Sequence, residues 1–425
     1  MRTAELRQLL TQAGPWTWLY TDGPTGAPEG AVESLKHSLT DRLTTAGVPP
    51  EDAEAAVAAV SADSSVPSPS TRWVLVRDGK VVLDETFATD RVAEEQYGHG
   101  DFPAVVPLLR HLAAESRILT VETGRDGARL TDAVIGQHEP ETAQTVDGED
   151  QQITKVQAGG WSQARYQRHA EEVWQHNQSE VAEAVDRIVR ERRPEHLFLS
   201  GDVRARQLLR ERISAEAAAL VVEVDADTRA AGADDTALHE AITETLASAR
   251  QTRIETARDR AAAGDGRAGA SGVSAVVAAL QQAQVDTLVL DPQTAGSDSV
   301  LLALRNDPWI AISKADAYGV DGTSLAAIEA MARAAVLTDA RVLFVEDELD
   351  DGEPRPERRT TPPVAALRWQ SGPDADETGA GAPDGSTGHR DAATGHPSQA
   401  EGEDPGERNS REDPRVAGHP SPAEG

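Results

Sequence analysis

The stretch that decides the fold is residues 153–193, which read ITKVQAGGWSQARYQRHAEEVWQHNQSEVAEAVDRIVRERR. A glycine pair, Gly159-Gly160, interrupts its start, and the remainder predicts one long helix. Apolar side chains recur at intervals of three and four residues, which is the spacing of an amphipathic helix with one buried stripe. These are Tyr166, Ala170, Val173, Trp174, Val181, Ala184, Val185 and Ile188.

The start of this helix is expected at Ser162, whose hydroxyl can accept a hydrogen bond from a free N–H of the first turn. Residues 157–163 then form a Gly-Gly loop at the end of a rod roughly 40 Å long, at 1.5 Å per residue. A narrow tip of this kind suits insertion into a confined space.

Length and composition limit the class of protein. A chain of 425 residues is long enough for two or three domains. It has no cysteine, which excludes disulfides and thiol chemistry. No run of 18 apolar residues occurs, and the first residues predict an amphipathic helix and no signal peptide. We therefore expect a cytoplasmic protein with no membrane partner.

The net charge of −31 is the strongest global feature. Such a charge argues against a broad nucleic-acid-binding surface, because the phosphates would repel most of the protein, and we expect no DNA partner. An acidic surface is also a solubility adaptation to high internal salt, and that interpretation stays open. Any contact with RNA must be local.

The chain order predicts three mixed α/β domains and a tail. Residues 1–115 form the first domain, 116–260 the middle domain and 270–370 the C-terminal domain. Residues 371–425 are rich in Gly, Pro, Ser, Asp and Glu, and they cannot bury enough apolar surface to offset their ordering entropy. We expect that acidic tail to be disordered.

In the first domain the clearest signal is a hairpin, in which Asp78-Gly79 joins two β-branched runs as a type I′ turn. Strand Trp16–Tyr20 is expected to alternate with period two. The expected helices span 3–13, 30–46, 51–61 and 105–115, and the hairpin strands span 73–77 and 80–87.

The middle domain is expected to begin with a second hairpin, whose turn is residues 124–127. After the long helix, strands alternate with helices, which predicts parallel pairing. The expected hairpin strands are 117–123 and 128–136, followed by strand 196–201, helix 202–213, strand 219–224 and helix 235–260.

A Gly/Ala-rich linker at 264–272 is expected before the C-terminal domain. That domain is predicted to contain helices 273–284 and 325–337, and strands 287–291, 309–313, 341–346 and 364–369.

This domain order, with a Gly-Gly loop on a long helix in the middle, resembles the archaeal and eukaryotic class-1 peptide-chain release factors and their relative Pelota. In that family a hairpin precedes a Gly-Gly-Gln loop and a helix that begins Ser-x-x-Arg-(aromatic)-x-Arg. Residues 159–168, GGWSQARYQR, match both glycines, the serine and both arginines. Residues 272–290 follow the helix-then-strand pattern of the family's last domain. The bacterial release-factor-like branch, which includes the hibernation factor Balon, is the most similar group.

Two departures from the family pattern bear on activity. Trp161 stands where the family has its catalytic glutamine, and Gln163 follows two positions later. A misplacement of about 1 Å can cost about 100-fold in rate, so Gln163 is a weak catalytic candidate and efficient ester hydrolysis is not expected. Nothing in 1–115 resembles the Asn-Ile-Lys-Ser element that reads stop codons, so codon-dependent termination is not expected.

The resemblance implies a ribosome-facing site at the tip. Trp161 can stack on a nucleobase, or it can pack as core against Tyr166 and Trp174. Arg165 and Arg168 lie three apart, so they can clamp phosphates together or pair with neighbouring glutamates on a solvated helix face. Gly159-Gly160 alone is also compatible with an ordinary connector. The predicted rRNA-binding set is Lys155, Gly159, Gly160, Trp161, Ser162, Gln163, Arg165 and Arg168.

Other chemistry finds little support in the sequence. His169 and His176 lack nearby cysteine or paired carboxylate ligands, so no zinc site is expected. Residues 264–269 lack the ending of a phosphate-binding loop. Ser200 and Ser313 sit in no nucleophile elbow. We expect no cofactor and no metal.

The resemblance therefore predicts a factor that occupies the ribosomal A site with its tip at the peptidyl transferase centre, and that protects idle ribosomes without chemistry. The C-terminal domain is expected to contact the ribosomal stalk base or a translational GTPase such as EF-Tu. Two alternatives stay open. One is a peptidyl-tRNA hydrolase that rescues stalled ribosomes, and the other is a stress-related interaction protein with no RNA contact.

Overall fold

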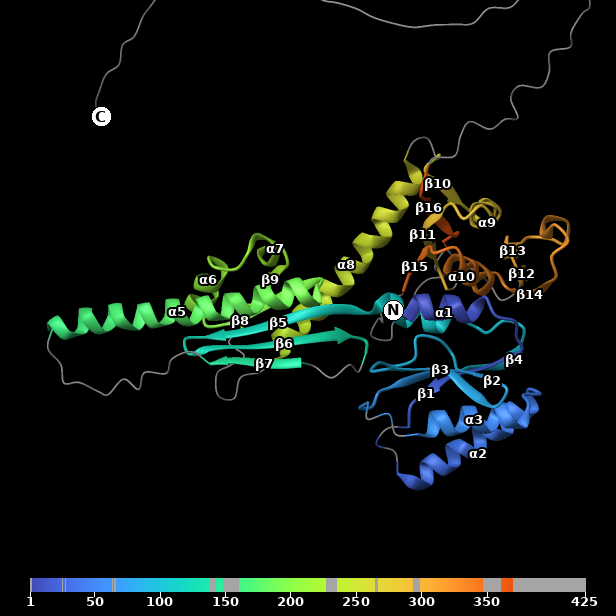
Figure 1. Ribbon diagram of the computed structural model, residues 1–425, viewed down its shortest axis with the longest axis horizontal. Coiled ribbons are helices and arrows are strands. Elements are labelled where there is room, and N and C mark those ends of the chain that lie inside the picture. The colour runs from blue at the N-terminus through green and yellow to red at the C-terminus, as the bar shows by residue number, and fades with distance from the viewer. Residues whose placement is uncertain are drawn as a thin grey trace, which may run out of the picture. The chain divides into compact units, whose positions relative to one another are not determined.

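The computed structural model describes residues 2–24, 26, 28–62, 64, 66–137, 142–147, 160–226, 235–263, 267–292, 299–346 and 361–369 (Figure 1). Met1–Pro373 form one compact unit of mixed helices and sheets, and the α/β class predicted from the sequence is confirmed. The predicted tail lies outside the described residues. Within those residues, no helix is long and apolar enough to cross a membrane.

The N-terminal sheet has the strand order β3-β2-β1-β4 and is antiparallel throughout. The hairpin predicted at Asp78-Gly79 is confirmed, with φ values of 53° and 69° at the two turn residues. Strand β4 was not predicted, because its sequence QYGHG holds two glycines and no β-branched residue. The strands are β1 Trp16–Asp22, β2 Thr71–Arg77, β3 Lys80–Phe87 and β4 Gln96–Gly100.

This sheet is covered on both faces. Helices α2 and α3 pack on one face with Leu19, and α1 and α4 pack on the other with Trp16 and Tyr20. The alternation predicted for β1 therefore sends successive side chains into two cores. The helices are α1 Arg2–Leu10, α2 Glu29–Thr45, α3 Pro50–Ser61 and α4 Val106–Ala114.

The middle sheet has the order β7-β6-β5-β8-β9. Strands β8 and β9 are parallel, as predicted, and β5 and β6 form the predicted hairpin. Strand β5 also pairs in parallel with β8, which was not predicted. Strand β7 was missed, because its exposed polar sequence reads as a loop. The strands are β5 Ser116–Gly124, β6 Gly127–Ile135, β7 Thr142–Asp147, β8 His196–Gly201 and β9 Val221–Glu223.

Helices cover both faces of this sheet as well (Figure 1). Helices α5, α6 and α7 pack on one face, and the first half of α8 packs on the other. The second half of α8 contributes Ile254 and Ala257 to a small core with Val289 and Leu343 of the C-terminal domain. The helices are α5 Gly160–Arg192, α6 Val203–Arg210, α7 Ala215–Ala218 and α8 Thr236–Ala262.

The C-terminal domain contains two sheets, of orders β10-β16-β11-β15 and β13-β12-β14. The linker predicted at 264–272 is wrong for Gly269–Ser271, which form β10. A Cβ at Gly269 would lie 2.3 Å from the Ala261 Cα, so glycine is what lets this strand approach α8. Strands β12 and β14 were also missed. The remaining elements are α9 Val273–Gln281, β11 Val285–Leu290, β12 Val300–Leu304, β13 Ile310–Ala311, 3₁₀ turn η1 Ala315–Ala317, β14 Gly322–Ala326, α10 Ala327–Leu337, β15 Arg341–Phe344 and β16 Val364–Leu367.

One hydrophobic core runs from the N-terminal sheet into the C-terminal domain, through α1, α4 and α10. Arg333 of α10 lies inside it, 1% exposed. Its guanidinium donates to the carbonyls of Leu304 (3.0 Å) and Leu10 (3.4 Å) and lies 4.2 Å above the Phe102 ring. Burial lowers the pKa of Arg333 to about 10. The side chain therefore stays cationic at neutral pH and ties both domains to α10.

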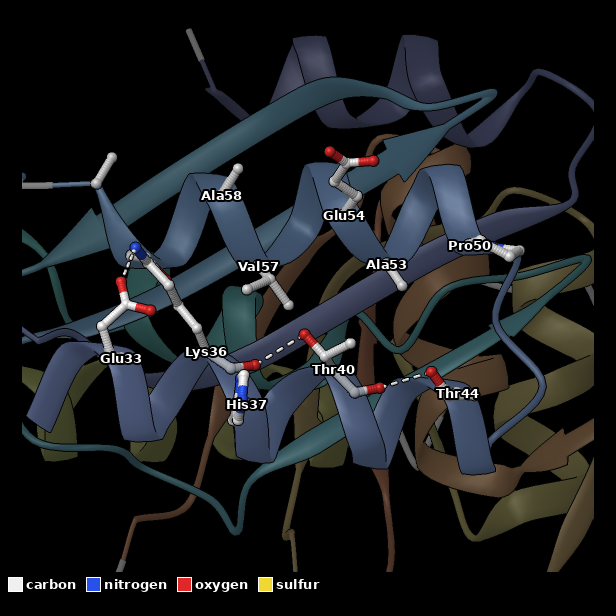
Figure 2. Close-up of a pocket in the computed structure, with 12 residues that line it drawn as sticks. Glu33, Lys36, His37, Thr40, Thr44, Pro50, Ala53, Glu54, Val57 and Ala58 are labelled. Carbon is white, nitrogen blue, oxygen red and sulfur yellow. Dashed lines mark hydrogen bonds and ion pairs between the residues drawn. The ribbon is translucent and has the colours of Figure 1, made fainter. Parts of the chain in front are cut away.

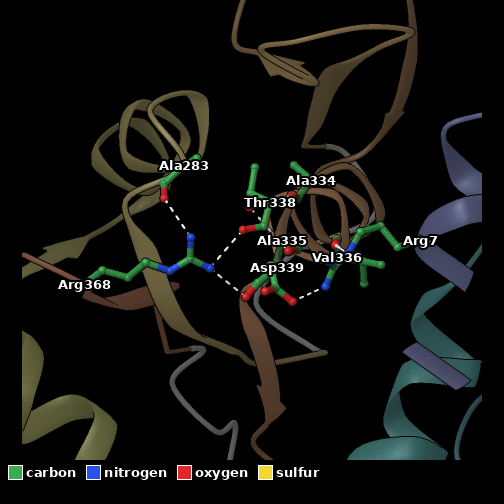
Figure 3. Close-up of polar contacts among 8 residues, drawn as sticks. All are labelled: Arg7, Ala283, Ala334, Ala335, Val336, Thr338, Asp339 and Arg368. Carbon is green, nitrogen blue, oxygen red and sulfur yellow. Dashed lines mark hydrogen bonds and ion pairs between the residues drawn. The ribbon is translucent and has the colours of Figure 1, made fainter. Parts of the chain in front are cut away.

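Two more arginines close the C-terminal end of α10 (Figure 3). Arg7 of α1 donates to the Val336 carbonyl at 2.9 Å and pairs with Asp339. Arg368 donates to the Thr338 carbonyl at 2.9 Å and to the Asp339 carbonyl at 2.6 Å. Cations suit this end of a helix because its last carbonyls carry partial negative charge.

At the other end of the interface, Glu329 of α10 caps α4. Its Oε2 accepts hydrogen bonds from the backbone N–H groups of Val105 (2.7 Å) and Val106 (3.1 Å). Burial raises the pKa of Glu329 to about 7, although both hydrogen bonds act in the opposite direction. The interface thus holds a carboxyl group that titrates near neutrality.

A second buried titratable group lies in α4. His111 stacks on Phe87 at a centroid distance of 4.2 Å, and its Nε2 lies 3.0 Å from the Tyr20 hydroxyl. Burial, with a smaller contribution from the charge of Arg110, lowers the pKa of His111 to about 4. The folded state therefore keeps this imidazole neutral.

We expect Glu329→Gln to stabilise the protein increasingly as the pH rises. The folded pKa is raised above the unfolded value of about 4.5, so the wild type loses stability as the pH rises from there through 7. The glutamine keeps an acceptor for both N–H groups without the buried charge. Urea unfolding at pH 5 and pH 8.5 should show a gain of about 3 kcal/mol at the higher pH only. The exposed Glu216→Gln serves as control, and an equal gain at both pH values would contradict this reasoning.

We expect the opposite pH dependence at His111. Its folded pKa is depressed, so its contribution is intact above about 6.5 and is lost as the pH falls through 4. His111→Gln should be less stable than the wild type at pH 7.5, yet it should lose about 2.5 kcal/mol less between pH 7.5 and 4.5. Urea unfolding of both proteins at the two pH values measures this difference. Parallel losses would show that the imidazole does not titrate in this range.

Candidate functional site

The residues predicted for the tip fall at the boundary of what the structure describes. Lys155 and Gly159 lie outside the described residues. The backbone from Gly160 onward is helical and belongs to α5, which therefore includes Trp161, Ser162 and Gln163. Arg165 and Arg168 occupy the same helix three positions apart. The side chains of residues 160–171 lie outside what the structure describes, and their roles stay predictions.

Two predictions at the tip are wrong. The loop predicted at 157–163 is helical from Gly160 onward, and Ser162, expected to cap the helix, is its third residue. Glycine is tolerated at the start of a helix, where it costs far less than in the middle. The helix therefore begins at the second glycine of the pair, two residues earlier than predicted.

Helix α5 is long and only partly buried. Its 33 residues extend about 50 Å at 1.5 Å per residue, and it projects past the edge of the middle sheet (Figure 1). The predicted apolar stripe is confirmed from Val173 to Ile188. Val181, Ala184 and Val185 are buried against β5, β6 and β8. Val173 and Trp174 are half-buried, so the packing weakens toward the N-terminal half of the helix.

Two buried amides fix α5 to the β5–β6 hairpin turn. Asn177 and Gln178 are each 1% exposed. The Gln178 Nε2 donates to the Gly124 carbonyl at 2.8 Å, and its Oε1 accepts from the Thr123 hydroxyl at 3.0 Å. The Asn177 Nδ2 donates to the Arg125 carbonyl at 3.1 Å. Buried amides paired in this way set both the position and the rotation of the helix.

Arg125, at the tip of that hairpin turn, connects α5 with α6. Its guanidinium lies 4.9 Å from the centre of the Trp174 ring, and its Nε donates to the Asp202 Oδ2 at 3.3 Å. Asp202 caps α6 by accepting from the N–H groups of Arg204 (2.9 Å) and Ala205 (3.1 Å). Burial alone would raise the pKa of Asp202, but these two hydrogen bonds and Arg125 together lower it. The carboxylate therefore stays ionised and holds the arginine in place.

A crevice of 420 Å³ opens here, at the carboxyl ends of the parallel strands β5, β8 and β9. This end of a parallel sheet is where ligands bind in open α/β folds. Gly201 shapes its floor with φ 108°, and a Cβ there would lie 2.0 Å from the Thr123 carbonyl oxygen. The charged residues of the lining are Arg125, Arg204, Arg206, Asp202 and Asp225.

A second hollow lies between α2 and α3 of the N-terminal domain (Figure 2). It has a volume of 610 Å³ and a mixed lining. Lys36 on its wall pairs with Glu33 at 2.7 Å, and the Thr40 hydroxyl donates to the Lys36 carbonyl at 2.8 Å. These polar groups are used within the helix, so the hollow presents no convergent set of catalytic groups.

The remaining candidates behave as structural residues. His176 lies 3.7 Å from Glu180 on the exposed side of α5. Over the described ranges, no three His, Cys, Asp or Glu side chains group as they would around a metal ion. Ser200 is buried, and the Ser313 hydroxyl donates to Asp316 at 2.7 Å. Asp225 pairs with Arg206 at 2.9 Å.

The sequence patterns did not identify the residues that attach α5 to the β5–β6 turn. Asn177 and Gln178 interrupt the apolar stripe between Trp174 and Val181, and two amides inside a buried stripe are a signal for a buried hydrogen-bond network. Arg125 was read only as a turn residue, because turn chemistry explains Gly124 and Gly127 without it.

Residues 117–267 match the sequence profile of bacterial archaeo-eukaryotic release factor family 2. The match begins in strand β5, passes through α5 and ends just after α8. The chain is also 25% identical over 336 residues to the uncharacterised protein Rv2629 of Mycobacterium tuberculosis strain H37Rv, which covers 74% of this chain and 88% of the relative. The same values hold for MT2704 of strain CDC 1551.

Among solved structures, the archaeal translation termination factor aRF1 covers 87% of this chain and 97% of its own length, at 16% identity and a TM-score of 0.21. Dom34 of Saccharomyces cerevisiae, a translation termination-like factor, covers 73% of this chain and 82% of its own, at 13% identity and a TM-score of 0.37. The match that identifies the chain is thus the sequence match over the middle domain. The resemblance predicted from the sequence is confirmed over residues 117–267, where the chain matches the bacterial archaeo-eukaryotic release factor family.

Proposed function

We propose that this protein binds the ribosome, occupies the A site with the end of α5 directed at the peptidyl transferase centre, and protects idle ribosomes without reading a codon. The observation that carries the proposal is a Gly-Gly segment at the start of a 33-residue helix, inside the segment that matches a release-factor family. A long helix that is anchored at its base suits delivery of a tip into a narrow site.

The charge distribution supports a contact limited to the tip. Residues 151–170, QQITKVQAGGWSQARYQRHA, contain no Asp or Glu and three cationic residues, Lys155, Arg165 and Arg168. The whole chain carries −31. Phosphates therefore attract this end of the middle domain and repel most of the remaining surface.

The proposal includes that the protein does not hydrolyse peptidyl-tRNA. Release by hydrolysis in this superfamily uses a glutamine directly after Gly-Gly, and this chain has Trp161 there. An indole cannot position a water as an amide does, but it can stack on an exposed base. Trp161 is therefore proposed as an anchor on rRNA.

The C-terminal domain is proposed to meet a translational GTPase such as EF-Tu. Its shared core with the N-terminal domain supports this role, because Arg333, Glu329 and Arg7 fix the two domains to each other. A rigid body of this kind lets a partner on one domain set the position of the other.

We expect the double change Gly159→Val/Gly160→Val to abolish ribosome association. Two β-branched residues at the helix start would stiffen and widen the tip. The wild type should sediment with 70S particles in stationary-phase lysate, and the variant should stay at the top of the sucrose gradient. Equal thermal stability of the two proteins controls for misfolding. A wild type that stays at the top across a salt series would contradict the proposal.

The hydrolase alternative has a separate test. Purified 70S complexes that carry labelled peptidyl-tRNA should retain their peptide when the wild type is added. Release that is lost in Gln163→Ala would show the protein to be an enzyme and would overturn the non-catalytic part of the proposal.

We expect Gln178→Leu to weaken the attachment of α5 to the β5–β6 turn. The change leaves the Gly124 carbonyl and the Thr123 hydroxyl without their partners in a buried site, at a cost of about 1–3 kcal/mol. Hydrogen exchange should accelerate in α5 around residues 172–180, and ribosome affinity should fall although the tip is unchanged. Gln175→Leu, an exposed position on the same helix, is the matched control. Unchanged exchange in Gln178→Leu would show that the amide does not anchor the helix.

A further inference from the structure

We propose that the crevice between the β5–β6 turn and α6 is a second RNA-binding site, in which Arg125 binds a backbone phosphate. The inference rests on the proposed ribosome association and adds to it a contact at the base of the rod. Among the described residues, its lining comes from the β5–β6 turn, from α6 and from the segment after β9.

Arg125 is held in a fixed orientation from three sides. Its main chain is fixed by the buried Asn177 amide at 3.1 Å, its guanidinium faces the Trp174 ring at 4.9 Å, and its Nε binds Asp202 at 3.3 Å. Asp202 is itself fixed by two N–H groups of the first turn of α6. An arginine with this support loses little conformational entropy when it binds a ligand.

The part of Arg125 that remains available is its terminal pair of nitrogens. Among the described residues, neither Nη1 nor Nη2 makes a hydrogen bond, and the side chain is 63% exposed. The planar pair of N–H donors matches two oxygens of a phosphate group. The carboxylate that orients the arginine occupies only its Nε.

The rest of the crevice is compatible with an anion. Three arginines and two aspartates are its charged lining residues, which leaves one positive charge in excess on a chain that carries −31. Arg206 is 7% exposed, donates to the Val224 carbonyl at 3.2 Å and pairs with Asp225 at 2.9 Å. Asp202 is already satisfied by Arg125 and by the two N–H groups of α6. The acidic groups are therefore committed within the protein.

The position of the site favours RNA over a small free anion. The crevice adjoins Trp174, which lies 14 residues after Gly160 on the same helix, or about 20 Å along its axis. A nucleic-acid strand that meets the tip can run along this helix and place a later phosphate at Arg125. The open crevice and the exposed guanidinium suit a contact with a polymer that lies on the surface.

Arg125→Ala and Arg125→Lys test the site. Binding to purified 70S ribosomes is measured by sedimentation between 50 and 300 mM KCl. Arg125→Ala should weaken binding about tenfold at low salt and reduce the slope of log affinity against log salt by about one. Arg125→Lys should keep the slope and recover affinity only in part, because lysine retains the positive charge but lacks the planar pair of N–H donors. Arg190→Ala, which removes an exposed arginine from the last turns of the same helix, should change affinity by less than about twofold.

The outcomes separate this inference from the proposed function. If the wild type binds 70S particles and Arg125→Ala matches it in affinity and slope, the inference is overturned and the proposed function stands. If the wild type does not bind 70S, the proposed function fails, and a labelled 20-nucleotide RNA then decides the inference. Binding of that RNA that depends on Arg125 supports the site, and its absence overturns it.

Two further measurements test for destabilisation by Arg125→Ala and for binding of free phosphate. If Arg125→Ala melts earlier than the wild type, Arg125→Gln, which retains a polar planar group without charge, replaces it and should show the same loss of slope. Inorganic phosphate at 10 mM should compete only weakly with RNA. Saturable binding of phosphate alone, with no affinity for RNA, would overturn the assignment to an RNA backbone.

Discussion

The proposed function depends on how one helix is held at its base. A 33-residue helix cannot bury its whole length against a five-stranded sheet. Among the described residues, the fully buried apolar contacts of α5 begin at Val181, and the buried amides of Asn177 and Gln178 precede them on the helix. Hydrogen bonds have directions, which apolar contacts lack. These amides therefore fix the direction of the helix at its base.

The N-terminal and C-terminal domains are fixed to each other by buried contacts. They share one core, in which an arginine without a carboxylate partner among the described residues bonds carbonyls from both sides. Burial of a guanidinium is costly, and here the bonds to backbone oxygens and the ring of Phe102 offset that cost. The middle domain is joined to this body mainly through α8, which packs on one sheet with its first half and on another with its second. A single helix shared by two cores transmits the position of one domain to the other.

The sequence predicted the elements whose signals are local. Asp78-Gly79 specifies its turn by itself, and the apolar spacing from Val173 to Ile188 specifies a helix face. The elements it missed depend on partners elsewhere in the chain. β4 is glycine-rich because the Trp18 ring lies where a Cβ of Gly98 would be, and β10 was read as a linker because Gly269 must approach Ala261. The same limit applies to the site. The Gly-Gly tip was found from a motif. The role of Arg125 depends on its contacts with Trp174 and Asp202, which the fold brings to the turn from distant parts of the chain.

The use of arginine links the fold to the proposed function. Arg333, Arg7 and Arg368 are committed to backbone carbonyls, and Arg110 is committed to Glu346. These arginines stabilise the protein and have little capacity left for a ligand. Arg125 differs, because its carboxylate partner orients it without covering its terminal nitrogens. On a chain with a net charge of −31, most of the surface repels RNA. Under the proposed function, this acidic surface limits RNA contact to regions with cations left for a ligand, and the end of α5 and the crevice beside its base are the two proposed here.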